Sequence, residues 1–112
     1  MQIDWAYLRS SWKTSAKTRE FLGSHKINIT ETINAHKEKI GAEAAWALLK
    51  SASVIYVVNG RKVSQWQPST KNKAAILGQA IGRSGNLRAP TIRHGDTFII
   101  GYDEALYQKI IQ

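Results

Sequence analysis

The segment that most constrains the fold runs from Asn86 to Tyr102, where two short apolar runs flank a glycine-containing turn. Thr91-Ile92 and Phe98-Ile99-Ile100 are typical of β-strands, and His94-Gly95-Asp96 between them is typical of a tight turn. Pro90 precedes the first run, where its missing N–H does not interrupt a ladder of hydrogen bonds. We therefore expect an antiparallel hairpin, with Pro90 either at a strand entrance or in a cis turn.

The remaining pattern predicts alternating strands and helices. Strands are expected over residues 3–8, 27–33, 54–58 and 61–66, with Asn59-Gly60 as a hairpin turn. Helices are expected over 13–25, 42–50 and 70–81, and from Asp103 onward. Ser69 and Asp103 are the predicted N-caps, and Gly82 is the predicted C-cap. His94 is expected to be a solvated turn residue.

This order of elements predicts an α/β fold with a central mixed β-sheet and helices on both faces, the thioredoxin-like arrangement. Strand, helix and strand over the first 33 residues should form a unit with two parallel strands. Residues 10–15 and 88–90 should then lie side by side at one end of the sheet, with Ala89-Pro90 cis. The length of 112 residues is that of one domain, so we expect a single domain over 1–112.

The composition excludes several classes of function. There is no cysteine, so the printed chain has no thiol chemistry and no disulfide. No apolar run approaches the ~20 residues of a membrane span, and the first twenty residues lack a signal-peptide pattern, so we expect a cytoplasmic protein that does not enter a membrane. The net charge of +8 favours anionic partners. The 16 basic residues are scattered, which favours a solvated basic surface over a dedicated nucleic-acid face.

Several segments also carry a family resemblance. The chain resembles the arsenate reductase (ArsC)/Spx family of thioredoxin-fold proteins, and it looks closest to the small branch with selenocysteine or cysteine at the active site. The most specific matching segment lies between Asn86 and Tyr102, and the match covers nearly the whole chain. The matching residues are Asp4-Trp5, Arg9, Phe21-Leu22, Glu31-Thr32, Ile40-Gly41, Gly85-Asn86-Leu87-Arg88-Ala89-Pro90-Thr91-Ile92 and Gly101-Tyr102-Asp103-Glu104-Ala105-Leu106-Tyr107.

The resemblance implies a redox site with its nucleophile in the loop after the first strand. The two redox positions of the family fall on Trp12 and Ser15, and both depart from its pattern. A thiolate at a helix N-terminus would be stabilised by backbone N–H groups and by nearby cations, here Arg9 and Lys13. The site implied by the resemblance therefore has Trp12, Ser15, Arg88 and Pro90 at its centre. Arg9, Lys13 and Arg88 are its expected anion- and substrate-binding residues.

Trp12 leaves two interpretations open. Trp12 is either a genuine residue of a redox-inactive relative kept for binding, or the printed reading of a UGA codon that encodes selenocysteine. Its coincidence with the redox position of the family favours the second interpretation. Ser15 lacks a signal for a partner base, so we expect it to cap a helix or to face water rather than to act as a nucleophile.

The expected activity is that of a thiol or selenol oxidoreductase, inactive as printed, with a thiol reductant such as glutathione or a thioredoxin/glutaredoxin system as its partner. We expect no cofactor and no metal site, because the three histidines lie far apart in the sequence. The first alternative is a non-enzymatic Spx-like regulator that binds RNA polymerase. The second alternative is a basic nucleic-acid-binding module, whose binding would weaken steeply with salt.

Overall fold

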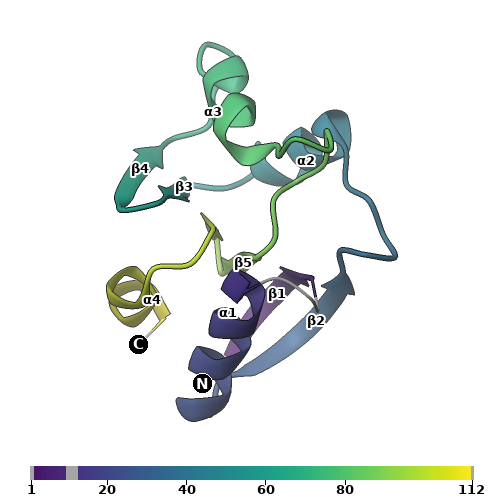
Figure 1. The fold of residues 1–112 in the computed structure, drawn as a ribbon. Coiled ribbons are helices and arrows are strands. Elements are labelled where there is room, and N and C mark those ends of the chain that lie inside the picture. Colours follow the sequence, from purple (N-terminus) through teal and green to yellow (C-terminus); the bar gives the residue numbers. More distant parts are fainter. Residues whose placement is uncertain (1, 10–12, 112) are drawn as a thin grey trace.

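The computed structural model describes residues 2–9 and 13–111, and these residues form an α/β structure around one mixed sheet (Figure 1). Six strands and four helices lie within these residues, and the helices flank the sheet. The predicted α/β class and the mixed sheet are therefore confirmed. In chain order the elements are β1 (Gln2–Leu8), α1 (Lys13–Ser24), β2 (Asn28–Asn34), α2 (Ala42–Leu49), β3 (Val54–Asn59), β4 (Lys62–Trp66), α3 (Lys73–Ala80), β5 (Thr91–His94), β6 (Thr97–Ile100) and α4 (Glu104–Ile111).

The strand order across the sheet is β2-β1-β5-β6-β3-β4. β1 and β2 are parallel, as the strand–helix–strand pattern predicted. The Pro90-led hairpin is also confirmed, because β5 pairs antiparallel with β6 and the turn between them contains Gly95 at φ +63°. β5 also pairs antiparallel with β1, and this pairing sets Tyr7 opposite Thr91. The end of β1 therefore lies beside the start of β5.

Apolar side chains fill both faces of the sheet. On one face α1 and α4 contribute Phe21, Leu22, Leu106 and Tyr107 to a buried cluster. On the other face α2 and α3 contribute residues such as Leu49 to a second cluster. Figure 1 shows α2 and α3 side by side, apart from α1 and α4. Each fully buried aliphatic or aromatic side chain stabilises the fold by roughly 1.5–3 kcal/mol, so the two clusters fix the sheet between its helices.

The boundaries of α3 differ from the prediction at both ends. The helix begins at Lys73, and Ser69 is not its N-cap. Instead, Asn72 folds its side chain back to accept a hydrogen bond from the Ser69 N–H (2.8 Å), which holds the preceding residues in a turn. At the other end the chain leaves the helix extended at Ile81 (φ −93°, ψ 128°), and Gly82 has no positive φ. The predicted C-cap at Gly82 is therefore wrong.

The local predictions for Asp103 and His94 have different outcomes. Asp103 is a confirmed cap, because its Oδ1 accepts a hydrogen bond from the Leu106 N–H at 2.8 Å. His94 is the last residue of β5 and is half-buried, so its expected place in a solvated turn is wrong. Within residues 2–9 and 13–111, no helix is long and apolar enough to cross a lipid bilayer.

Candidate functional site

The first turn of α1 and the segment before β5 line one hollow of about 220 Å³, which we call the Pro90 hollow. The β1–β5 pairing brings them together, because it sets the end of β1 beside the start of β5. The Ala89–Pro90 peptide bond is cis, as expected. The lining residues are Thr14, Lys17, Val58, Gly60, Arg88, Ala89, Pro90, Gly101 and Tyr102.

The residues expected around the redox position differ from one another in their exposure and contacts. Trp12 lies outside the described residues. Lys13 is the first residue of α1 and is exposed, and it does not line the Pro90 hollow. Ser15 is fully buried, and its Oγ accepts a hydrogen bond from the Arg9 backbone N–H at 3.1 Å. Of the two roles expected for Ser15, facing water is wrong because the residue is buried. Its hydroxyl accepts from Arg9, outside the helix, and so fastens the end of the β1 segment to α1 instead of capping the helix.

Arg88 is held by a set of protein acceptors. One terminal nitrogen donates to Asn59 Oδ1 (2.9 Å) and to the carbonyl of Gln79 (3.2 Å). The other donates to the carbonyl of Val58 (2.9 Å). Burial lowers the pKa of the Arg88 guanidinium, although the group keeps its charge at neutral pH. Arg88 therefore ties the segment before Pro90 to the ends of β3 and α3.

A chain of buried polar contacts runs beneath the Pro90 hollow. The Gly101 N–H donates to the Pro90 carbonyl (2.8 Å), and the Gly101 carbonyl accepts from the Tyr107 hydroxyl (2.8 Å). The Tyr107 oxygen lies 3.1 Å from Thr18 Oγ1, which donates to the carbonyl of Thr14 (3.1 Å). Burial raises the pKa of the Tyr107 hydroxyl well above its ordinary value. This chain of contacts connects the cis peptide to the first turn of α1.

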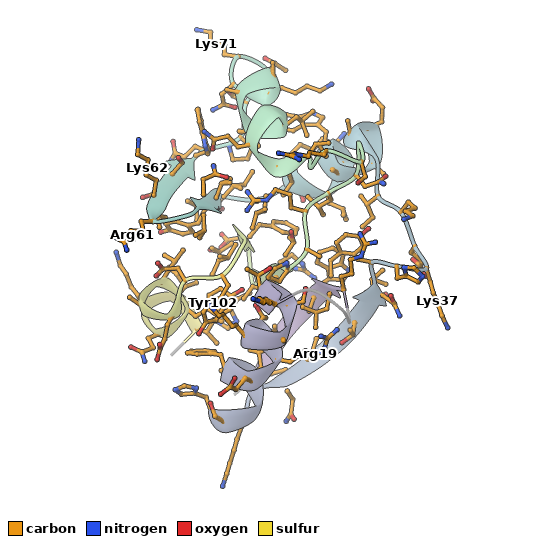
Figure 2. The ribbon with its side chains drawn as sticks, in the orientation of Figure 1. Arg19, Lys37, Arg61, Lys62, Lys71 and Tyr102 are labelled. Carbon is orange, nitrogen blue, oxygen red and sulfur yellow. The ribbon has the colours of Figure 1, made fainter. Side chains whose placement is uncertain are left out.

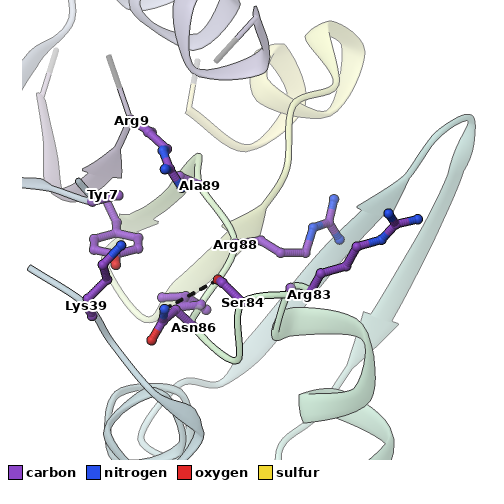
Figure 3. Close-up of a pocket in the computed structure, with 11 residues that line it drawn as sticks. Tyr7, Arg9, Lys39, Arg83, Ser84, Asn86, Arg88 and Ala89 are labelled. Atoms are coloured by element: carbon purple, nitrogen blue, oxygen red, sulfur yellow. Dashed lines mark hydrogen bonds between the residues drawn. The ribbon is translucent and has the colours of Figure 1, made fainter. Parts of the chain in front are cut away.

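A second and larger cavity, of about 300 Å³, lies on the other side of the same segment (Figure 3). We call it the Tyr7 cavity. Its lining holds four cations and no carboxylate among the described residues, and it shares Arg88 and Ala89 with the Pro90 hollow. The lining residues are Tyr7, Arg9, Ala35, Lys39, Gly82, Arg83, Ser84, Asn86, Leu87, Arg88 and Ala89.

The sequence indicated only part of this cavity. Arg9 and Arg88 were expected to bind anions, and both line it. Tyr7 and Lys39 were missed. Their positions carry a weak signal at most, because Lys39 is one of several scattered lysines and Tyr7 belongs to an ordinary strand pattern.

Several other cations project outward. Figure 2 shows Arg61 and Lys62 extending from one edge of the molecule, and Lys71 and Lys37 from two others. These four cations do not gather at one edge in this view. Among the described residues, no group of three His, Asp or Glu side chains is arranged to hold a metal ion.

No model of a known protein family matches the chain, and a search of curated proteins found no significant match.

Proposed function

We propose that this chain is a thioredoxin-fold protein of the arsenate reductase-like class, whose ancestral activity is that of a thiol or selenol oxidoreductase in the cytoplasm. One observation carries the proposal: the first turn of α1 and Pro90 line the same hollow. The reaction position of the class would directly precede this turn in the sequence, at residue 12. A thiol reductant, such as glutathione or a thioredoxin/glutaredoxin system, is the partner that the activity requires.

The start of α1 suits an anionic nucleophile. Its first turn contains no acidic residue, and Lys13 and Lys17 place positive charge there. The unpaired backbone N–H groups of a helix start and the helix dipole also favour negative charge, which lowers the pKa of a thiol at that position. Tryptophan has no group that can cycle through a disulfide. The buried Ser15 hydroxyl is already used by the Arg9 backbone. The printed chain should therefore be inactive in redox chemistry.

The proposal is tested by placing a single cysteine at each end of α1. We expect the thiol of the Trp12→Cys variant to react with iodoacetamide with a pH midpoint about one unit or more below the ~8.5 of a free cysteine. Ser24→Cys is the matched control, because Ser24 is exposed at the last residue of the same helix. The chain has no other cysteine, so each profile reports one thiol. Equal midpoints in the two variants would exclude an activating position at residue 12.

The nucleotide triplet at codon 12 then distinguishes the two interpretations of Trp12. A TGA triplet followed by a selenocysteine insertion hairpin would restore the nucleophile and the enzyme. A TGG triplet would leave a redox-inactive relative that retains only binding.

A further inference from the structure

We infer that the Tyr7 cavity is a binding site for a small organic anion, a phosphate monoester or carboxylate attached to a compact flat ring. The inference goes beyond the proposed redox function and does not depend on it, because it uses neither residue 12 nor a thiol. It rests on the size of the cavity, its apolar floor, the cations in its lining and its rigid walls.

The size and floor of the cavity suit a flat apolar group. A volume of about 300 Å³ lies at the lower end of the range for small-molecule sites. Ala35, Leu87 and Ala89 provide apolar surface beside the ring of Tyr7. The Tyr7 hydroxyl donates to the carbonyl of Glu38 (2.7 Å) and the side chain is buried, so the ring closes the floor of the cavity without offering a polar group. This ring stacks on Trp5 with an interplanar angle of 1°, which fixes its orientation.

The charge around the floor is positive. Figure 3 shows Arg9 and Lys39 on the same side as Tyr7, whereas the guanidinium groups of Arg83 and Arg88 point away from it. We therefore assign the anionic group of the ligand to the space between Arg9 and Lys39. Glu38 is close enough to contribute to the raised pKa of Tyr7, which burial mainly causes, but its side chain does not line the cavity.

The opposite wall adds polar groups at the far side of the cavity. Asn86 Nδ2 donates to Ser84 Oγ at 3.3 Å. Because a hydroxyl both accepts and donates, Ser84 can still donate a hydrogen bond to a ligand oxygen. A ligand that spans the cavity can thus contact cations at one end and this hydroxyl at the other.

Backbone hydrogen bonds hold this wall in place. The Leu87 N–H donates to the carbonyl of Ile40 (2.6 Å), and the Gly82 N–H donates to the carbonyl of Asn86 (2.8 Å). Gly41 and Asn86 also form an isolated β-bridge. The two walls are therefore connected before any ligand arrives, and a preformed site loses little entropy on binding.

Phenyl phosphate is a suitable probe, with inorganic phosphate and phenol as its two halves. In a ¹H–¹⁵N titration of the whole chain, we expect phenyl phosphate to shift the amides of Ser84, Asn86 and Leu87 saturably. Each half should bind about tenfold or more weakly, because it makes only part of the contacts. Equal binding by inorganic phosphate would overturn the assignment of an organic anion. The absence of a saturable shift at these amides would overturn the site itself.

A pair of lysine variants separates a local contact from general charge attraction. Lys39→Gln should weaken phenyl phosphate binding by about fivefold or more, whereas Lys37→Gln should change it by less than about twofold. Both residues are exposed, they lie two positions apart and they lose the same charge, but only Lys39 lines the cavity. Unchanged thermal unfolding confirms that both variants fold. An equal loss of binding in the two variants would overturn the proposed site.

Discussion

The Pro90 hollow and the Tyr7 cavity share Arg88 and Ala89 but use their polar groups differently. Beneath the Pro90 hollow, polar groups contact one another in a series that runs from the Thr14 carbonyl through Tyr107 to the Pro90 carbonyl. The Tyr7 cavity instead gathers cations in its lining without a carboxylate among the described residues. The first arrangement holds backbone in position, and the second concentrates positive charge around a cavity.

This difference separates the expected effects of mutation. Changes around the Pro90 hollow should lower the free energy of unfolding, because they leave buried donors or acceptors without partners. Changes at the exposed cations of the Tyr7 cavity should alter binding with little effect on stability, because exposed charges contribute little to folding.

The largest loss of stability is expected at Gly101. Its φ is +100°, and an added Cβ would lie 2.9 Å from Val58 Cβ and 3.0 Å from the Val58 carbonyl oxygen. Val58 belongs to the buried β3 strand, so neither atom can move away cheaply. Gly101→Ala should lower the free energy of unfolding by about 4 kcal/mol, from backbone strain together with overpacking. Urea denaturation measures this loss.

Gly78→Ala is the matched control for this substitution. Gly78 lies inside α3, and an added Cβ there would meet nothing within 4 Å. Alanine should stabilise this helix by up to about 1 kcal/mol. If Gly101→Ala were as stable as the parent chain, the close approach of Gly101 to β3 would not be required.

A smaller loss is expected for Arg88→Lys. Lysine keeps the charge but cannot reach Asn59 Oδ1, the Gln79 carbonyl and the Val58 carbonyl together. The free energy of unfolding should fall by about 2 kcal/mol, because partly buried carbonyls lose their donors. Arg83→Lys, at another cation of the Tyr7 cavity, should change it by less than about 0.5 kcal/mol. Equal stability of the two variants would mean that Arg88 is not a structural tie.

Local sequence signals predicted the fold well wherever a short segment determines its own structure. The hairpin after Pro90, the parallel β1–β2 pair and the Asp103 cap all follow from patterns within a few residues or one strand–helix–strand unit. The predicted boundaries of α3 were wrong at both ends, because hydrogen bonds that the sequence pattern does not reveal determine where the helix begins and ends. At its start, the Asn72 side chain accepts a hydrogen bond from the Ser69 N–H. At its end, Ile81 is extended and forms an antiparallel β-bridge with Leu87.

The site was harder to predict, because its contacts join residues distant in the sequence. Arg88 was expected to bind an anion, but its partners lie on β3 and at the end of α3. Lys39, Tyr7 and Ser84 line one cavity only after the sheet and the segment before β5 have assembled. No periodicity or motif encodes this arrangement, so the resemblance indicated Arg9 and Arg88 of the Tyr7 cavity but neither Tyr7 nor Lys39.

The smallest of the three losses is expected for Tyr107→Phe. The substitution keeps the buried ring but removes the hydroxyl that donates to the Gly101 carbonyl and contacts Thr18. The free energy of unfolding should fall by about 1–2 kcal/mol, because the buried carbonyl loses its donor. Tyr56→Phe, at a half-buried tyrosine of β3, should change it by less than about 0.5 kcal/mol. A similar loss in both variants would mean that the Tyr107 hydroxyl contributes no more to the free energy of unfolding than that of Tyr56.

The same variant also has an expected pH signature. Burial raises the pKa of Tyr107 in the folded chain above the value of 10.0 that describes an exposed tyrosine. The contribution of its protonated hydroxyl to stability is therefore complete below pH 10 and is lost as the pH rises toward the folded pKa. The parent chain should lose stability above pH 10 by up to about 1.4 kcal/mol per pH unit from this group. Tyr107→Phe should show a shallower decline, although Tyr7 and Tyr102, whose pKa values are also raised, retain part of it. Parallel declines, measured by urea denaturation between pH 9 and about pH 11, would show that the Tyr107 hydroxyl is not held protonated by the fold.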